Sequence, residues 1–435
     1  MLHSAPIVPS LNSDQQKAVA GIFQFLFSDD KEFIVSGPAG TGKTFLMNHI
    51  MKTVIQEYTN ASKLLGQTPI DYEVALTATT NKAVEVLSVA TGFPATTVHS
   101  FMNLKVVDNY TTGVSSITRT NSWKVHKNQL IFVDEASMID TKLHDFILLG
   151  TDSSCKIIYL GDHCQMAPVF ETISPVYKHP KNFVNLTEPM RNAGQPALVD
   201  LCARLRNTVE TGKFFQLPSV PGVIDYLDGP SAQQFIDTTF KVENPGCRML
   251  CYTNARVQEY NDYVRNLRGY PDLFTEGEVL INNSGIQLGK TFLRVEQELT
   301  VNKVLSTPAP HSLDATDPNA TIDVYRVELS TPGGSPISVM IPSNTDHYKA
   351  MMKHFARIKD WTKFYFLKNN FPDLRQKDAA TVYKAQGSTY KSVFLDLGNI
   401  GKCTKEDQLA RMLYVGASRA TTRLFLFGQL PDRLF

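Results

Sequence analysis

The stretch that decides the fold is Phe33–Leu46, FIVSGPAGTGKTFL. Its first three residues predict a buried parallel strand, and its last residues predict the apolar start of a helix. The loop between them carries the P-loop pattern in its required strand–loop–helix context, at Gly37, Pro38, Ala39, Gly40, Thr41, Gly42, Lys43 and Thr44. Such a loop turns backbone N–H groups toward phosphate oxygens, while the lysine reaches the β- and γ-phosphates and the threonine hydroxyl binds Mg²⁺. The stretch therefore predicts a nucleotide site, and a glycine-rich turn that matches by chance is the weaker interpretation.

Length and composition place this site in a larger protein. A chain of 435 residues is too long for one ordinary core, so we expect about two to four domains. The formal net charge is only +1, which excludes a broadly basic surface and leaves a local groove as the form of any nucleic-acid site. The six cysteines form no CxxC pair, which predicts reduced thiols. Because no apolar stretch has the length of a membrane span and no signal-peptide pattern is present, we expect a cytoplasmic protein without a membrane partner.

Apolar runs alternate with helical patterns along the first half of the chain, which is typical of a parallel α/β sheet. The expected elements are a helix over 11–27, a helix over Asn81–Ala90, and strands over Val74–Thr79, Leu130–Val133, Cys155–Leu160 and Asn185–Glu188. Residues 102–127 are polar and carry Gly113 between β-prone runs, which predicts a hairpin inserted into this domain.

A second α/β block follows from about Met190, with a helix over Ala197–Arg206, a strand over Arg248–Tyr252 and a helix over Ala255–Asn266. Between 278 and 344 the chain forms short β runs broken by proline and glycine, which predicts a small antiparallel barrel, and residues 346–371 look helical. The α/β pattern returns after this segment, so the barrel is expected as an insertion in the second α/β domain.

Two carboxylates follow an apolar strand at residues 131–135, IFVDE. Asp134 is placed to hold Mg²⁺, and Glu135 is placed to orient and deprotonate a water. The same pair could instead cap a helix, since acidic residues suit a helix N-terminus. The P-loop upstream favours catalysis, and an Asp-Glu pair suits hydrolysis better than transfer to a small acceptor.

The next strand and two later strand–helix junctions supply further candidates. Gln165, in LGDHCQ, can sense a γ-phosphate or hold the attacking water, although a polar loop at a sheet edge is a common alternative. His163 and Cys164 lack a companion pair of metal ligands, so we expect no metal site there. Arg191 and Arg419 are candidates to stabilise charge on a transferring phosphate, although most arginines are simply solvated.

Further segments complete an ordered series. They are LNSDQ, ATTNKAVEVL, TTVHSF, IFVDEASM, YLGDHCQMAPV, LTEPMR, YTNARVQEYN, TVYKAQGST and LYVGASRA. From Leu11 to Phe427 this series resembles the superfamily 1B (RecD-like) DNA helicases. Two positions depart from that pattern: Tyr383 stands where the family usually has histidine, and Ser418 where it usually has threonine. A tyrosine keeps an aromatic platform but does not titrate near neutral pH, so the DNA contact at this position is in doubt.

The resemblance implies an α/β fold with two RecA-like P-loop domains built on parallel sheets, an inserted β-hairpin (pin) and an inserted SH3-like small β-barrel. The implied boundaries are 1–101 and 128–189 for domain 1A, 102–127 for pin 1B, 190–277 and 376–435 for domain 2A, and 278–375 for barrel 2B with its helical extension.

The resemblance also implies site residues. Gln15 corresponds to the adenine-binding glutamine, and Gln386 and Gly387 to nucleotide contacts. The implied DNA contacts are Thr80, Asn81, Thr97, His99, Thr253, Asn254, Tyr383, Lys384 and Ser388, which suit phosphates and sugars more than base sequence. Threonine and asparagine at strand ends are more often helix caps, so the set carries more weight than any member. Tyr110 and Trp123 are the candidate pin residues, although an aromatic in a hairpin more often serves packing.

The function that the resemblance implies is an ATP-dependent DNA helicase that uses Mg²⁺, moves 5′ to 3′ on single-stranded DNA and separates duplex DNA as its two RecA-like domains close. Single-stranded DNA and single-strand/duplex forks are the implied partners, a single-stranded-DNA-binding protein is a candidate partner, and a functional monomer is expected. Bacteriophage replication or recombination is the implied setting. The alternatives are a translocase that mainly displaces bound proteins, a small-molecule P-loop phosphotransferase, and a DNA-binding module with a vestigial ATP site.

Overall fold

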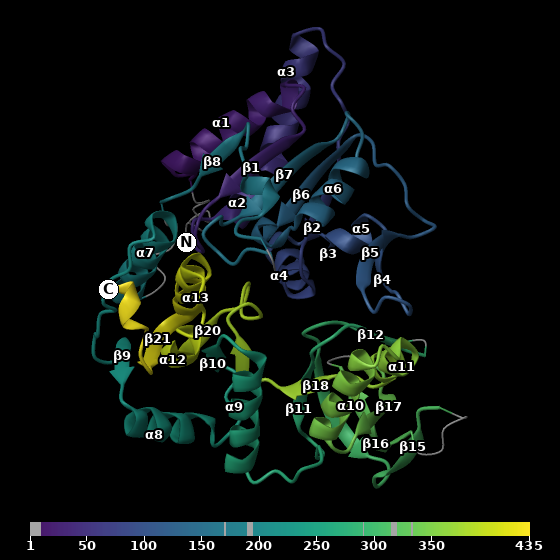
Figure 1. The fold of residues 1–435 in the computed structure, drawn as a ribbon. Helices are drawn as coiled ribbons and strands as arrows, with labels where there is room; N and C mark the ends of the chain where they lie inside the picture. The colour runs from purple at the N-terminus through teal and green to yellow at the C-terminus, as the bar shows by residue number, and fades with distance from the viewer. Residues whose placement is uncertain (1–9, 169–170, 189–194, 290, 315–319, 332–333) are drawn as a thin grey trace, which may run out of the picture.

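The computed structural model describes residues 10–168, 171–188, 195–289, 291–314, 320–331 and 334–435. Two parallel sheets, one in each half of the chain, are accompanied by helices, and an antiparallel sheet lies beside the second of them (Figure 1). The parallel sheets confirm the expected α/β class. Within the described residues, no helix combines the length and the apolar character that a membrane span needs.

The first parallel sheet has the strand order β3-β2-β6-β7-β1-β8. Its strands are β1 (Glu32–Ser36), β2 (Glu73–Ala78), β3 (Ala95–Thr97), β6 (Gln129–Asp134), β7 (Lys156–Gly161) and β8 (Phe183–Asn185). The accompanying helices are α1 (Ser13–Phe27), α2 (Lys43–His49), α3 (Ile55–Leu64), α4 (Asn81–Thr91), α5 (Val98–Phe101) and α6 (Thr141–Leu149). Central strands β6 and β7 are buried on both faces, since separate apolar clusters lie on the two sides, and this explains their continuous apolar sequence.

The second parallel sheet has the strand order β19-β10-β20-β21-β9. Its strands are β9 (Ile224–Leu227), β10 (Cys247–Cys251), β19 (Ala379–Thr381), β20 (Tyr390–Asp396) and β21 (Ala420–Phe427). The accompanying helices are α7 (Pro196–Thr211), α8 (Gly229–Phe240), α9 (Asn254–Leu267), α12 (Leu397–Ile400) and α13 (Glu406–Ser418). The chain therefore leaves this sheet after β10 and α9 and returns to it at β19, as an insertion requires.

The inserted segment forms an antiparallel sheet in the order β15-β16-β14-β11-β18, with β17 also paired to β16. Its strands are β11 (Val279–Asn282), β14 (Glu298–Val304), β15 (Ala309–Ser312), β16 (Thr321–Ser330), β17 (Ile337–Pro342) and β18 (Leu374–Gln376), and β12 (Ile286–Leu288) pairs with β13 (Thr291–Leu293) as a separate ribbon. Two helices follow, α10 (Thr345–Arg357) and α11 (Trp361–Asn370). The strands and helices confirm the expected secondary structure of the segment, and the SH3-like barrel remains a prediction.

The hairpin expected in residues 102–127 is present as β4 (Leu104–Asp108) and β5 (Ser115–Arg119). Its loop contacts α11 of the inserted segment, as the neighbouring positions of β4 and α11 in Figure 1 show. Lys368 of α11 pairs with Asp108 at 2.9 Å, and a Cβ added to Gly113 would lie only 2.3 Å from the Trp361 ring. The hairpin thus joins the first sheet to the insertion in the second.

One strand was expected in the wrong place. The prediction began at Asn185, whereas β8 ends there. After Asn185 the N–H groups of Thr187 and Glu188 donate to the Asp14 carboxylate on α1 instead of extending the ladder. A long-range acceptor of this kind has no local sequence signal, so the apolar pattern alone misplaces the strand.

Candidate nucleotide site and DNA groove

The P-loop joins β1 to α2 in the expected context. Gly40 and Gly42 have φ values of +87° and +79°, a conformation that favours glycine. A Cβ on Gly37 would lie 2.6 Å from the carbonyl oxygen of Leu186, so this position also requires glycine. The backbone conformation thus requires glycine at two of these positions, and the close approach of Leu186 requires it at the third. These requirements support the P-loop interpretation over a chance match.

Lys43 and Gln15 both contact the backbone of this loop. The Lys43 ammonium donates to the carbonyl oxygens of Gly37 and Pro38 at 2.6 and 3.0 Å, so it lies over the loop. The Gln15 side chain is fully buried, and its Nε2 donates to the carbonyl oxygen of Thr41 at 3.0 Å. Its Oε1 accepts from the N–H of Asn12 in a capping box at the start of α1. Gln15 thus supports the P-loop from the α1 side.

Asp134 and Glu135 lie at the carboxyl end of β6. Burial, together with the charge of Glu135, raises the pKa of Asp134 to about 6. Glu135 has a φ of +55°, a left-handed conformation that is strained for a residue with a Cβ. Two adjacent carboxylates lie near the cation Lys43, and their combined negative charge exceeds its single positive charge, so the donor set fits a divalent cation such as Mg²⁺.

The raised pKa makes Asp134 a source of instability in the metal-free protein. Its ionised form is penalised on folding, so the penalty is complete above pH 6 and disappears as the pH falls toward the unfolded value of 3.8. We expect Asp134→Asn in EDTA to raise the free energy of unfolding by about 2 kcal/mol at pH 8. Thermal melting from pH 4 to 8 measures this, and a wild-type advantage that grows with pH would contradict it.

Gln386 connects the second sheet to this acidic pair. Its Nε2 donates to Glu135 Oε2 at 3.2 Å and to Ser137 Oγ at 2.8 Å. Gly387 follows with a φ of +77°, and a Cβ there would lie 3.6 Å from Glu135 Oε1. The structure therefore brings both residues predicted as nucleotide contacts to the carboxylate that follows Asp134.

The loop after β7 is held by helices of the second sheet. Asp162 is fully buried, accepts a hydrogen bond of 2.6 Å from the Tyr414 hydroxyl of α13, and lies 3.6 Å from Arg206 of α7. Arg411 of α13 donates to the carbonyl oxygen of Gln165 at 2.6 Å. The Gln165 side chain is nearly buried, and among the described residues its Oε1 has no hydrogen-bond partner. The predicted γ-phosphate sensor thus sits on a loop that contacts both parallel sheets.

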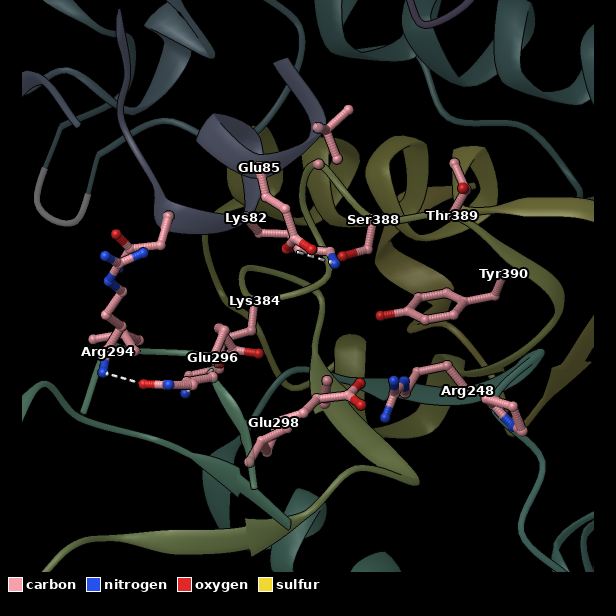
Figure 2. Close-up of a pocket in the computed structure, with 18 of the residues that line it drawn as sticks. Lys82, Glu85, Arg248, Arg294, Glu296, Glu298, Lys384, Ser388, Thr389 and Tyr390 are labelled. Atoms are coloured by element: carbon pink, nitrogen blue, oxygen red, sulfur yellow. Dashed lines mark hydrogen bonds and ion pairs between the residues drawn. The ribbon is translucent and has the colours of Figure 1, made fainter. Parts of the chain in front are cut away.

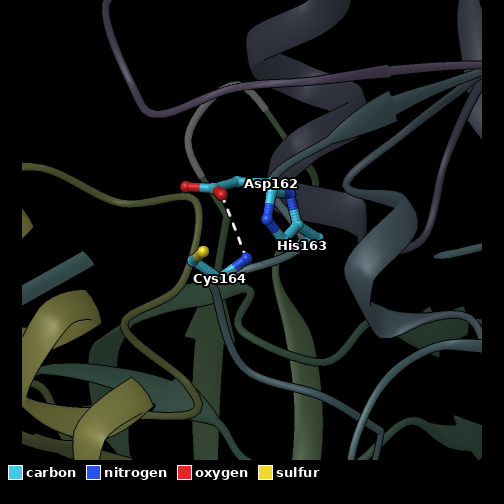
Figure 3. Close-up of side chains that lie close together, drawn as sticks. All are labelled: Asp162, His163 and Cys164. Atoms are coloured by element: carbon cyan, nitrogen blue, oxygen red, sulfur yellow. Dashed lines mark hydrogen bonds between the residues drawn. The ribbon is translucent and has the colours of Figure 1, made fainter. Parts of the chain in front are cut away.

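Asp162, His163 and Cys164 place three potential metal ligands within 4.8 Å of one another (Figure 3). The Asp162 carboxylate already serves the Cys164 N–H, Tyr414 and Arg206. His163 Nδ1 is hydrogen-bonded to Ser36 Oγ at 2.8 Å. Arg206 also lies close enough to lower the pKa of His163, after burial as the main cause, so the surroundings are unfavourable for a cation. These contacts favour a structural role for the cluster.

Of the two arginines predicted to stabilise phosphate charge, the structure describes only Arg419. Arg419 is 3% exposed, and its guanidinium donates to the carbonyl oxygens of Val415 and Ser388 and to the Ser418 hydroxyl. In this conformation it is held within its own half of the protein. Arg191 lies outside the described residues.

A groove of about 740 Å³ lies where α4, the segment 384–390 and the inserted strands meet (Figure 2). It brings together the predicted residues Asn81, Lys384, Gly387 and Ser388. Both cations and carboxylates line it, namely Lys82, Glu85, Arg248, Arg294, Glu296 and Glu298. The low net charge of the chain excluded a broadly basic surface, and a local, partly basic groove of this kind is the form of nucleic-acid site that remained.

Other predicted DNA contacts lie outside this groove. Thr80, Thr97 and Thr253 cap the helices α4, α5 and α9, which is the ordinary role of such residues. Asn254 begins α9, and His99 lies in α5, where burial lowers the pKa of its imidazole.

Tyr383 lines a separate cavity of about 260 Å³ together with Tyr252, and its hydroxyl is hydrogen-bonded to Gln408. The side chains of Tyr383 and Lys384 therefore line different cavities, although the two residues are adjacent in sequence.

The two candidate pin aromatics also differ. Tyr110 lies in the hairpin loop, is 52% exposed and packs on Tyr365 of α11, with ring centroids 4.8 Å apart. Trp123 follows β5 and packs against Phe146 and the Arg119 guanidinium at the base of the hairpin. Only Tyr110 occupies the loop where a strand-separating residue would be expected.

Sequence reasoning missed several groove residues. Arg248 at the start of β10 stacks on the Tyr390 ring at 4.9 Å, and its buried Nε has no hydrogen-bond partner among the described residues. Arg294 and Lys82 line the same groove. Lys82 lies within the quoted segment ATTNKAVEVL and could have been found from it, whereas only the tertiary structure brings the two arginines to the groove.

Comparison with known proteins supports one family. The family model described as "AAA domain" matches residues 10–214, and the model described as "UvrD-like helicase C-terminal domain" matches residues 378–427. The chain is 24% identical to the "ATP-dependent DNA helicase dda" of Enterobacteria phage T4, over 95% of this chain and 98% of that protein. It is 23% identical to "Uncharacterized protein R530" of Acanthamoeba polyphaga mimivirus, over 95% and 99%. Among solved structures, the Pif1 helicase from Candida albicans aligns with a TM-score of 0.48 and 16% identity, covering 98% of each chain.

Proposed function

Since this chain is a superfamily 1B DNA helicase related to the Dda helicase of phage T4, we propose that it moves 5′ to 3′ on single-stranded DNA and unwinds duplex DNA by coupling ATP hydrolysis to closure of its two parallel-sheet domains. One observation supports this coupling most strongly. Within residues 384–388, Gln386 touches Glu135 at the nucleotide site while Lys384 and Ser388 line the groove. A single short loop therefore contacts both sites, so movement at one is transmitted to the other.

The nucleotide site binds ATP through the P-loop. Backbone N–H groups and Lys43 hold the phosphates, and Thr44 with Asp134 would hold Mg²⁺. Mg²⁺ supplies positive charge against the phosphate oxygens when bound. Gln15, buried behind the loop, fixes the loop's position relative to α1 and so to the adenine end of the site.

Hydrolysis is divided between the two sheets. Glu135 orients and deprotonates the attacking water, and Gln165 holds the same water through a neutral amide. Arg191 and Arg419 stabilise the negative charge of the transferring phosphoryl group. Because Arg419 is buried within its own half, it must turn toward the nucleotide as the domains close, and closure then controls the rate.

The groove holds the DNA backbone, and the inserted segments act on the duplex. Contacts from Asn81, Lys384 and Ser388 to phosphates and sugars carry no sequence preference, as a motor on varied DNA requires. The hairpin β4–β5 is the proposed pin, the antiparallel sheet the proposed SH3-like barrel, and Tyr110 the proposed stacking residue. The contact between Asp108 and Lys368 holds the pin against the barrel's helices. We propose that a monomer performs the work on single-strand/duplex forks.

The proposal is tested by steady-state ATP hydrolysis with and without single-stranded DNA. We expect DNA to raise the rate at least about 10-fold. We expect Lys43→Ala to lower it on the order of 10³-fold, because the phosphates lose their principal cation. Lys31→Ala is the matched control, since Lys31 lies at the far end of β1 and donates to Leu148 and Thr151. A rate indifferent to both DNA and Lys43 would refute the proposal.

A further inference from the structure

Lys384, the cation that the proposed function assigns to DNA, already has an anionic partner. Its ammonium lies 3.0 Å from Glu296 Oε1 and is also hydrogen-bonded to the Asn283 side chain. Both partners belong to the inserted segment, whereas Lys384 belongs to the loop that contacts Glu135. Figure 2 shows Lys384 beside Glu296 in the groove.

The turn that carries Glu296 has a fixed shape. Glu296 has a φ of +61°, and its N–H donates to the carbonyl oxygen of Asn282 at 2.8 Å. Asn282 is fully buried, and its Nδ2 donates to the carbonyl oxygens of Leu293 and Arg294 at 3.2 and 3.0 Å. A strained backbone held by a buried amide indicates that the surrounding structure specifies the position of this carboxylate.

The amide that completes the cradle is fixed as well. Asn283 Nδ2 donates to Asp373 Oδ2 at 2.6 Å, and Arg375 holds the same carboxylate at 2.9 Å. The Lys384 ammonium is therefore held by two groups of fixed orientation in the inserted segment, the Asn283 amide and the Glu296 carboxylate. These two groups engage two of the three ammonium protons, and a DNA phosphate bound to the same ammonium would lie close to the Glu296 carboxylate, which repels it.

We propose that Glu296 is a phosphate surrogate: it holds Lys384 in the DNA-free protein, and a backbone phosphate of single-stranded DNA displaces it on binding. This inference rests on the proposed function and adds a consequence to it. Without DNA, the Lys384–Glu296 pair ties the loop 384–388 to the inserted sheet. With DNA, the pair opens, and the loop is free to follow the closing of the domains. The carboxylate thus lowers the affinity for DNA and makes release of the loop depend on DNA.

The test compares two glutamates of the inserted segment. Glu296→Gln keeps the size and the backbone requirement of residue 296 and removes the charge that faces Lys384. Glu328→Gln removes an equal charge from β16 of the same segment, but Glu328 does not line the groove and accepts a hydrogen bond from Asn302 instead. Using a fluorescent oligo-dT and the full chain at 0.15 M salt, we expect Glu296→Gln to lower the Kd about 5-fold and Glu328→Gln to change it less than about 2-fold.

The same measurement in a Lys384→Ala background decides the mechanism. There Glu296→Gln is expected to have no effect on the Kd, because the competition for Lys384 no longer exists. Equal effects of the two glutamine variants, an unchanged Kd in Glu296→Gln, or a Glu296→Gln effect that persists without Lys384 would overturn the inference while leaving the proposed function intact. A wild-type protein that binds no oligo-dT would overturn both.

Discussion

Glu135→Gln is expected to lower the DNA-stimulated rate of ATP hydrolysis about 10³-fold, because the variant has no base to accept the proton of the attacking water. The amide of a glutamine can still accept the hydrogen bond from Gln386 Nε2, which spans 3.2 Å in the wild type. The left-handed backbone at this position is unchanged by the substitution. Binding of nucleotide and of oligo-dT should therefore remain within about 2-fold of wild type.

The matched control is Glu73→Gln. Glu73 lies at the amino end of β2 and is hydrogen-bonded to Gln129 at 2.7 Å. Both residues lie at the amino ends of strands in the same sheet, whereas Glu135 follows the carboxyl end of β6. This control should hydrolyse ATP at the wild-type rate. A Glu135→Gln enzyme that keeps more than about a tenth of the wild-type rate would remove Glu135 from the role of base.

Arg419→Ala carries the other large expected effect. An arginine that reaches the transferring phosphoryl group is worth about 10³–10⁵ in rate, so we expect a loss of at least about 10³-fold in the DNA-stimulated rate. The affinity for DNA should change little, since Arg419 does not itself line the groove and its guanidinium donates to Val415, Ser418 and the backbone carbonyl of Ser388. The remaining rate should be measured with and without DNA. If Arg419 reaches the nucleotide only when the domains close, the variant should hydrolyse ATP more slowly and should also lose the stimulation of hydrolysis by DNA.

Arg423→Ala provides the comparison for this residue. Arg423 lies four residues later on β21 and pairs with Asp225 at 2.6 Å. Because Arg419 is buried, thermal melting of both variants separates unfolding from lost chemistry, and Arg419→Lys provides a folded variant with the charge retained. A wild-type rate in a folded Arg419→Lys protein, together with less than a 10-fold loss in a folded Arg419→Ala protein, would contradict the assigned role.

Much of the fold follows from local patterns in the sequence. The buried strands β1, β6 and β7 have continuous apolar sequences, and the carboxyl ends of β1 and β6 carry the P-loop and Asp134. Parallel strands present these ends at one edge, so the P-loop and the acidic pair could be expected together from the sequence. The inserted hairpin was also predictable, because turn residues separate two β-prone runs.

The remainder depends on contacts between distant residues. Nothing near Gln15 in sequence shows that its amide is used by the Thr41 carbonyl. The side chains of Tyr383 and Lys384 enter different cavities, which the motif they share does not indicate. The pairing of Lys384 with Glu296 joins residues 88 positions apart, and the carboxylate belongs to an inserted segment with no recognised motif. Such pairs are set by the packing of whole domains, which local patterns in the sequence do not reveal.

Strand displacement on tailed DNA duplexes tests the central claim most directly, namely that hydrolysis at the divided nucleotide site drives movement along one strand. With ATP and Mg²⁺ in a single-turnover experiment, we predict that a duplex with a 5′ single-stranded tail is separated and that one with only a 3′ tail is separated much more slowly. Faster separation from the 3′ tail would reverse the proposed direction. No ATP-dependent separation of either duplex, by a protein that hydrolyses ATP when single-stranded DNA is added, would contradict the account of the motor.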